Sequence, residues 1–142
     1  METKITSFTG NYDFLANTFP NPIKYNGIIY ICADSAFWAQ RVKDENARKK
    51  FKRLSANEAR KKALQAEPVE NWDAIKISIM EDILIEKFKD PVLKKHLLAT
   101  NKLSLINGNT YRDNYWGIYN GSGKNRLGKL LEKVRDYYNQ TI

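Results

Sequence analysis

The sequence predicts a small α+β fold that is mainly helical. Several segments repeat apolar residues at helical spacing, whereas the segments that favour strands are short. These strands are expected to pair as small antiparallel hairpins rather than as βαβ units. A chain of 142 residues can bury one hydrophobic core, so we expect a single compact domain over residues 1–142.

A hairpin is expected near the N-terminus. The segments IKY and IIYIC flank Asn26-Gly27, a dipeptide that tolerates positive φ and favours a two-residue turn. This turn would place Tyr25 beside Ile28. A second hairpin is expected where LSLI and NTY flank Asn107-Gly108, before a loop rich in glycine and asparagine.

Helices are expected over most of the remaining chain. The first should run from Asp34 to about Arg53, and Ser55 with Glu58 matches a capping box that begins the second. Three more are expected: over NWDAIKISIMEDILIEKF, with Trp72, Ile75, Ile79, Ile83 and Phe88 on one face; over VLKKHLLAT after the cap Asp90-Pro91; and from about Asn125, with Leu127, Leu130, Leu131, Val134 and Tyr138 on one stripe.

The net charge of +8 is concentrated in one segment. Ten basic and three acidic residues lie between Arg41 and Lys62, so residues 41–62 carry +7. Such a segment attracts polyanions through phosphate neutralisation and counterion release. We therefore expect nucleic acid or a polyphosphate ligand as a partner, with a merely solvated helix face as the alternative.

Several classes of protein are not expected. The apolar stretches are too short to cross a membrane, and the N-terminus lacks the pattern of a secretion signal, so we expect a cytoplasmic protein without a membrane partner. Cys32 is the sole cysteine and His96 the sole histidine. Neither has the spacing of a metal site, and we expect no metal and no cofactor.

A first candidate site lies on the first expected helix. Asp34 and Arg41 are seven residues apart, which places them on one face with Phe37 and Trp38 between them. The carboxylate, aromatic rings and cation would suit a polar ring system and ribose hydroxyls. The alternative is a core stripe that ends in a salt bridge. Trp72 is expected in the core.

A second candidate site lies on the loop before the last helix. A glycine-rich stretch there leads into a helix N-terminus, where free amides and the helix dipole favour a phosphate. The spacing is not that of a P-loop, and a simple turn with an Asn125 cap is the alternative. The candidate residues are Asp113, Trp116, Gly117, Gly121, Gly123, Lys124 and Asn125.

These features occur in an order that resembles the NADAR or YbiA-like domains, also described as riboflavin-intermediate N-glycosidases. The resemblance spans about Phe8 to Tyr138, and its last two segments are the most specific. The matching segments are FLANTFPNPIKYNGIIY, CADSAFWAQR, WDAIKISIMEDILIEKF, LLATN, LINGNTYRDNYWG and GSGKNRLGKLLEKVR.

The resemblance implies a mostly helical domain that cleaves N-glycosidic bonds to a phosphorylated ribose. It implies catalytic carboxylates at Asp34 and Asp113, and Asn17 as a pocket residue. The family usually has glutamate at the first of these positions and lysine where Arg41 stands. Because a guanidinium stays protonated, Arg41 cannot replace a nucleophilic lysine, although it can hold a phosphate or ribose.

The leading hypothesis is an N-glycosidase-type hydrolase that removes ADP-ribose from guanine bases of DNA or RNA, held through residues 41–62. Its catalytic candidates are Asp34, Asp113 and Arg41, and either Trp38 or Trp116 would stack on a base. One alternative is a weakly active or inactive module that binds ligands derived from ADP-ribose or NAD. The others are hydrolysis of riboflavin intermediates and nucleic-acid binding by charge alone.

Overall fold

The computed structural model describes residues 3–140, which fall into two compact units. The central unit comprises residues 17–89, and the terminal unit combines residues 3–16 with residues 90–140. Helices outweigh strands in both units, so the predicted class, α+β and mainly helical, is confirmed. The expectation of a single domain over residues 1–142 stays a prediction.

The central unit begins with the expected hairpin. Strands β2 (Ile23–Tyr25) and β3 (Ile28–Tyr30) pair antiparallel, with Tyr25 opposite Ile28 as predicted. Asn26 and Gly27 both have positive φ, at 50° and 81°. This is the conformation that a tight two-residue turn requires, and it matches the twist of the two strands.

Four α-helices and one short 3-10 helix complete the central unit. The helix expected from Asp34 to Arg53 is wrong in its extent, because the chain leaves helical geometry at Val42, which forms an isolated bridge with Pro68. The elements are α1 (Ala33–Arg41), α2 (Glu45–Arg48), the 3-10 helix η2 (Lys49–Phe51), α3 (Ala56–Leu64) and α4 (Trp72–Lys87).

The predicted capping box at the start of α3 is confirmed. The Ser55 amide donates to Glu58 Oε1 at 3.0 Å, and the Glu58 amide donates to Ser55 Oγ at 3.2 Å. Two amides at the helix start are thereby satisfied.

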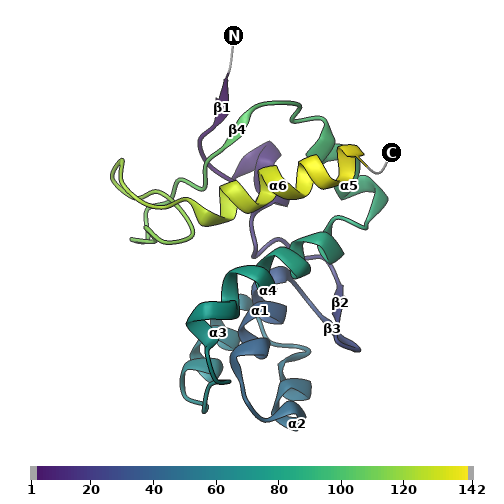
Figure 1. Ribbon diagram of the computed structural model, residues 1–142, viewed down its shortest axis with the longest axis vertical. Coiled ribbons are helices and arrows are strands. Elements are labelled where there is room, and N and C mark those ends of the chain that lie inside the picture. The colour runs from purple at the N-terminus through teal and green to yellow at the C-terminus, as the bar shows by residue number, and fades with distance from the viewer. Residues whose placement is uncertain (1–2, 141–142) are drawn as a thin grey trace. The chain divides into compact units, whose positions relative to one another are not determined.

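Helix α1 packs against both α3 and α4 (Figure 1). The buried face of α4 contains Met80, Ile83 and Leu84, and Phe88, which follows the last residue of the helix, is buried as well. Ile83 and Phe88 were expected there, but Ile75 was not correctly placed, since it is 37% exposed. Each residue of a helix is rotated by about 100° from the one before it. A predicted apolar face that is displaced by one residue therefore points away from the core.

The terminal unit joins the two ends of the described chain. Strand β1 (Lys4–Ile5) pairs in parallel with β4 (Ser104–Leu105), so the second expected hairpin is wrong. Gly108 instead forms a parallel bridge with Ile118, and neither Asn107 nor Gly108 has the positive φ of a hairpin turn. The helical elements are the 3-10 helix η1 (Gly10–Leu15), α5 (Pro91–Leu98) and α6 (Arg126–Gln140).

Both α-helices of the terminal unit begin near the expected residues. The Asp90 carboxylate accepts from the amides of Val92 and Leu93, which confirms the predicted cap of α5. Figure 1 shows α6 as the last labelled helix, in yellow. Its predicted apolar stripe is confirmed, because Leu127, Leu130, Leu131, Val134 and Tyr138 are all buried.

Candidate functional site

The structure brings Asp34 and Asn17 together in the central unit. Asp34 lies in the first turn of α1, and its amide donates to the Asn17 carbonyl oxygen at 3.0 Å. Asn17 is only 8% exposed, and its Nδ2 contacts the Met80 sulfur at 3.5 Å. Its Oδ1 accepts no hydrogen bond from any residue between 3 and 140. Buried amide oxygens without a donor are uncommon, so this atom is available to a ligand hydroxyl or N–H.

The later part of α1 borders an open cleft of about 640 Å³. Trp38 and Arg41 line this cleft, whereas Phe37 is 2% exposed and belongs to the core. The prediction that both aromatic rings share one ligand-facing surface is therefore wrong for Phe37. The lining residues are Trp38, Arg41, Leu64, Pro68, Val69, Asn71, Trp72, Asp73, Ala74 and Lys76.

The guanidinium of Arg41 also has a structural contact. Its Nη1 donates to the Ala63 carbonyl oxygen at 2.6 Å, near the C-terminal end of α3. Arg41 thus ties the end of α1 to the end of α3, while its position at the cleft keeps it a candidate for binding phosphate. Its catalytic role stays a prediction.

Trp72 is a cleft residue that the sequence analysis missed. It was expected in the core, but its side chain is only half-buried and lines the cleft with Trp38. The available signal was position, because Trp72 is the first residue of α4 and precedes the buried stripe that begins at Met80. Trp72 therefore lies in the first turn of α4, before the part of the helix that is buried in the core.

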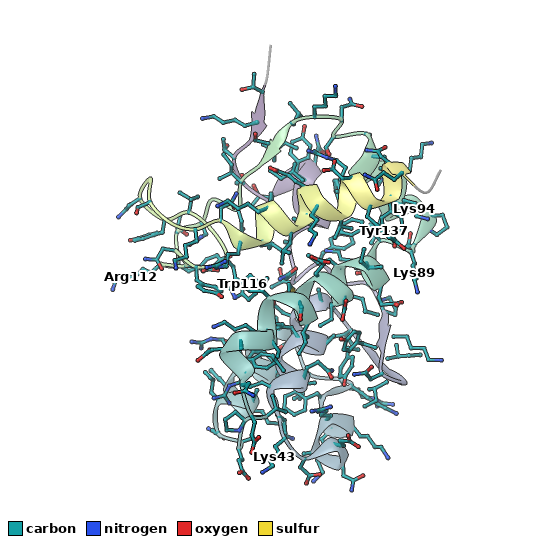
Figure 2. The ribbon with its side chains drawn as sticks, in the orientation of Figure 1. Lys43, Lys89, Lys94, Arg112, Trp116 and Tyr137 are labelled. Atoms are coloured by element: carbon teal, nitrogen blue, oxygen red, sulfur yellow. The ribbon has the colours of Figure 1, made fainter. Side chains whose placement is uncertain are left out.

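In the terminal unit, Asp113 organises the loop that carries Trp116. Its Oδ1 accepts from the amides of Tyr115, at 3.1 Å, and Trp116, at 2.9 Å. Asn109 fixes the same residue from the other side, since its Oδ1 accepts from the Asp113 amide and its Nδ2 donates to the Asp113 carbonyl. Figure 2 labels Trp116 and Arg112 on this loop before α6.

The glycine turn does not leave open the amides that the phosphate prediction required at the start of α6. The amides of Lys124, Asn125, Arg126 and Leu127 donate to the carbonyl oxygens of Asn114, Gly117, Tyr115 and Trp116, respectively. That part of the prediction is wrong, because the preceding loop folds back on the helix start. The ligand-binding roles of Gly117, Gly121, Gly123 and Lys124 stay predictions.

The side chain of Asn125 does not cap α6, which was the alternative to its predicted role in ligand binding. Its Oδ1 accepts from the Asn107 amide and its Nδ2 donates to the Leu105 carbonyl, both at 2.9 Å. The side-chain amide therefore joins β4 to the start of α6. Gly123 has a φ of 151°, and a Cβ there would collide with the Gly117 carbonyl oxygen. These contacts show why the loop needs these residue types independently of any ligand.

Most basic residues of the segment 41–62 are exposed on the central unit. Arg41 and Arg48 are exceptions, since their guanidinium groups donate to the carbonyls of Ala63 and Val42. Lys43, labelled in Figure 2, lies 3.5 Å from the Glu67 carboxylate. We define the basic surface as the eight exposed residues Lys43, Lys49, Lys50, Lys52, Arg53, Arg60, Lys61 and Lys62.

Neither a metal cluster nor a membrane span was found in the part of the chain that the structure describes. Over residues 3–140, no three His, Cys, Asp or Glu side chains gather in a way that could hold a metal ion. Over the same residues, every helix is too short or too polar to cross a bilayer.

The fold and the order of these features define a member of the NADAR domain family. The family description "NADAR domain" matches residues 2–138, and the chain belongs to this family. The N-glycosidase YbiA of Shigella flexneri serotype 5b (strain 8401) is 35% identical over 135 residues, which cover 92% of this chain and 84% of that protein. The N-glycosidase YbiA of Escherichia coli (strain K12) is 34% identical with the same coverage.

Two further comparisons bear on fold and function. The NMR structure of the E. coli protein YbiA superposes with a TM-score of 0.86 at 30% identity, and covers 99% of this chain and 88% of that one. The riboflavin biosynthesis protein VVA0006 of Vibrio vulnificus (strain YJ016) is 29% identical over 133 residues. That match covers 89% of this chain but 35% of the Vibrio protein.

Proposed function

We propose that this chain is an N-glycosidase that removes ADP-ribose from guanine bases of nucleic acid. Its family and its relatives named N-glycosidases support hydrolysis of an N-glycosidic bond. The basic surface is the observation that carries the choice of substrate. A nucleic-acid strand offers many phosphates to eight exposed cations, whereas a small metabolite has no need of so extended a surface.

The proposed reaction breaks the bond between the anomeric carbon of the ribose and the guanine nitrogen. Water supplies a hydroxyl group to the anomeric carbon and, in net balance, a proton to the departing nitrogen. Positive charge develops on the sugar as the bond breaks, and a fixed carboxylate nearby stabilises it. We assign this role to Asp34, and we assign to Asn17 Oδ1 an acceptor role toward a ribose hydroxyl.

Asp113 is assigned a positioning role. Its carboxylate accepts from the amides of Tyr115 and Trp116 and thereby fixes the backbone that carries the Trp116 indole, the ring that we assign to stacking on a base. Lys124 is exposed at the following turn and is the phosphate candidate of that loop. The resemblance implied a catalytic carboxylate at Asp113, whereas this assignment gives its carboxylate the task of holding the loop.

The test is a guanine-ADP-ribosylated oligonucleotide incubated with the protein. We expect free ADP-ribose and an intact guanine base by mass spectrometry, and loss of at least a hundredfold in rate for Asp34→Asn. The control is Asp136→Asn, the same change at an exposed carboxylate on α6. Equal release by the wild type and Asp34→Asn, at matched folded fraction, would reject the assignment of Asp34.

A second candidate function is a binding module with little catalysis. The observation in its favour is Arg41, which stands where the resemblance implies a lysine and whose Nη1 donates to the Ala63 carbonyl. On the hydrolase proposal, Arg41→Lys leaves kcat within a few-fold and lowers stability, because one ammonium does not reproduce the guanidinium geometry. A tenfold or larger gain in kcat would instead show that the wild type lacks a catalytic lysine.

A third candidate is hydrolysis of a ribosylated pyrimidine, favoured by the name of the Vibrio relative. Turnover of a phosphoribosyl-aminopyrimidine is the corresponding assay. We expect its kcat/KM to lie at least tenfold below that of the modified oligonucleotide, because it makes no contact with the basic surface. The reverse order would favour the metabolite as substrate.

A further inference from the structure

The cleft of the central unit has the walls of a stacking site. Trp38 and Trp72 both line it and both are half-buried, so each keeps part of its indole exposed. Phe37 supports them from the core, with ring centroids 5.4 Å from Trp38 and 5.1 Å from Trp72. Phe37 is 2% exposed, so the two indoles pack against a ring that is held in the core.

The other walls of the cleft suit a flat, partly polar ring. Leu64, Pro68, Val69 and Ala74 provide apolar surface. Arg41 also lines the cleft, and its position is fixed by the hydrogen bond to the Ala63 carbonyl. Aromatic rings beside a fixed cation are the features with which proteins hold unpaired bases of a nucleic-acid strand.

The cleft adjoins the basic surface. Leu64 lines the cleft and is the last residue of α3, and the same helix exposes Arg60, Lys61 and Lys62. Arg60 precedes Leu64 by four residues, a rise of about 6 Å, and therefore lies on the same face of α3 roughly one helical turn from Leu64. Lys49, Lys50, Lys52 and Arg53, on the segment that precedes α3, extend the positive charge.

Three acidic groups near this surface are engaged by neighbouring residues, and one of them, Asp73, also lines the cleft. The Glu58 carboxylate accepts from the Ser55 amide in the capping box. Glu67 lies 3.5 Å from Lys43, and Asp73 lies 3.0 Å from Lys76. Residues 49–53 and 60–62 contain no acidic residue, so no carboxylate within either stretch neutralises their positive charge.

We propose that the cleft and the adjoining part of the basic surface form a docking site for single-stranded nucleic acid. One unpaired base stacks on Trp38 and Trp72, and the strand's phosphates follow residues 49–53 and 60–62. A single strand is preferred to a duplex, because a base must leave its stack and its partner to enter the cleft. This inference rests on the proposed nucleic-acid substrate, but it concerns binding and not hydrolysis.

The test measures binding of unmodified oligonucleotides by fluorescence anisotropy, with circular dichroism to verify folding. We expect single strands to bind at least tenfold more tightly than the duplex of the same sequence. Trp72→Leu should lower the affinity for the single strand at least fivefold without altering its salt dependence. Trp72→Phe should retain most of that affinity, because it keeps an aromatic ring. The double variant Arg60→Ala/Lys61→Ala should weaken binding and reduce the salt slope by about 1.4.

The matched control is Lys102→Ala/Lys129→Ala, which removes two exposed lysines from the terminal unit. It should leave affinity within twofold. Equal affinity for duplex and single strand, or unchanged binding by folded Trp72→Leu, would overturn the docking site. If the protein still hydrolysed the modified base in that case, the proposed function would be retained and only the docking site rejected. Intact binding without release of ADP-ribose would instead retain the docking site and reject the hydrolase.

Discussion

At the scale of single residues, Asp113 shows how a side chain predicted for chemistry has a structural task. Its Oδ1 accepts from two consecutive amides, those of Tyr115 and Trp116. Asparagine can keep this acceptor, whereas alanine cannot. We expect Asp113→Ala to lower the free energy of unfolding by about 2 kcal/mol and Asp113→Asn by about half as much, measured by urea denaturation.

The same pair of variants separates positioning from catalysis. With a positioning role, Asp113→Asn retains the hydrolase rate within a few-fold and Asp113→Ala loses it together with the order of the loop. If Asp113→Asn were stable yet as inactive as Asp34→Asn, the carboxylate itself would take part in the reaction. Tryptophan fluorescence in a Trp38→Phe/Trp72→Phe background, where Trp116 is the remaining tryptophan, gives an independent measure of loop order in each variant.

Tyr25 provides a prediction about pH. Its hydroxyl donates to Asp82 Oδ2 at 3.4 Å, and burial, together with the Asp82 carboxylate, raises the pKa of Tyr25 to about 12. An unfolded tyrosine ionises near pH 10. The stabilisation is therefore complete below about pH 10 and is lost as pH rises through 12, because the unfolded chain ionises first.

An ultraviolet difference titration checks this assignment. Tyr25→Phe should remove one phenol that ionises near pH 12, and Asp82→Asn should lower the pKa of Tyr25 toward its ordinary value. Adding Asp82→Asn to Tyr25→Phe should produce no further change in the phenol titration. If the pKa of Tyr25 were unaffected by Asp82→Asn, Asp82 would be excluded as a cause, and burial and the Glu86 carboxylate would remain.

At the scale of elements, α3 depends on a cap that the sequence revealed. Ser55 and Glu58 exchange hydrogen bonds at the helix start. We expect Ser55→Ala to lower the free energy of unfolding by about 1 kcal/mol, measured by urea denaturation. Asn57→Ala, at an exposed position of the same helix, is the control and should change stability by less than about 0.5 kcal/mol. Similar losses for both would show that the capping box adds nothing.

Elements set by local chemistry could be predicted from the sequence, and those set by distant partners could not. The turn at Asn26-Gly27, the cap at Asp90 and the apolar stripe of α6 each depend on neighbouring residues. By contrast, β4 pairs with β1, about a hundred residues earlier, and this pairing takes Asn107-Gly108 out of a hairpin turn. A local pattern contains no information on such a partner.

The candidate site follows the same division. The place of Asp34 on the first helix followed from the pattern, whereas its contact with Asn17 depends on a backbone hydrogen bond across the fold. Trp72 was assigned to the core because helical periodicity does not show where the packed part of a face ends. The occupied amides at the start of α6 were missed because the loop returns to its own helix.

At the scale of the whole molecule, the charge distribution makes a kinetic prediction. The net charge is +8, and residues 41–62 contribute +7 of it. Such an uneven distribution attracts a nucleic-acid strand before contact, and added salt screens that attraction over a Debye length of about 10 Å at 0.1 M. If nucleic acid is the substrate, salt should act on the encounter rather than on bond cleavage.

We therefore expect kcat/KM for the modified oligonucleotide to fall at least tenfold between about 50 and 200 mM salt, with kcat changed less than twofold. The modified mononucleoside serves as control, because it lacks the neighbouring phosphates and should lose no more than about twofold. Arg60→Ala/Lys61→Ala should flatten the salt dependence of the oligonucleotide alone. Parallel salt curves for oligonucleotide and nucleoside would mean that the positive segment plays no part in capturing substrate.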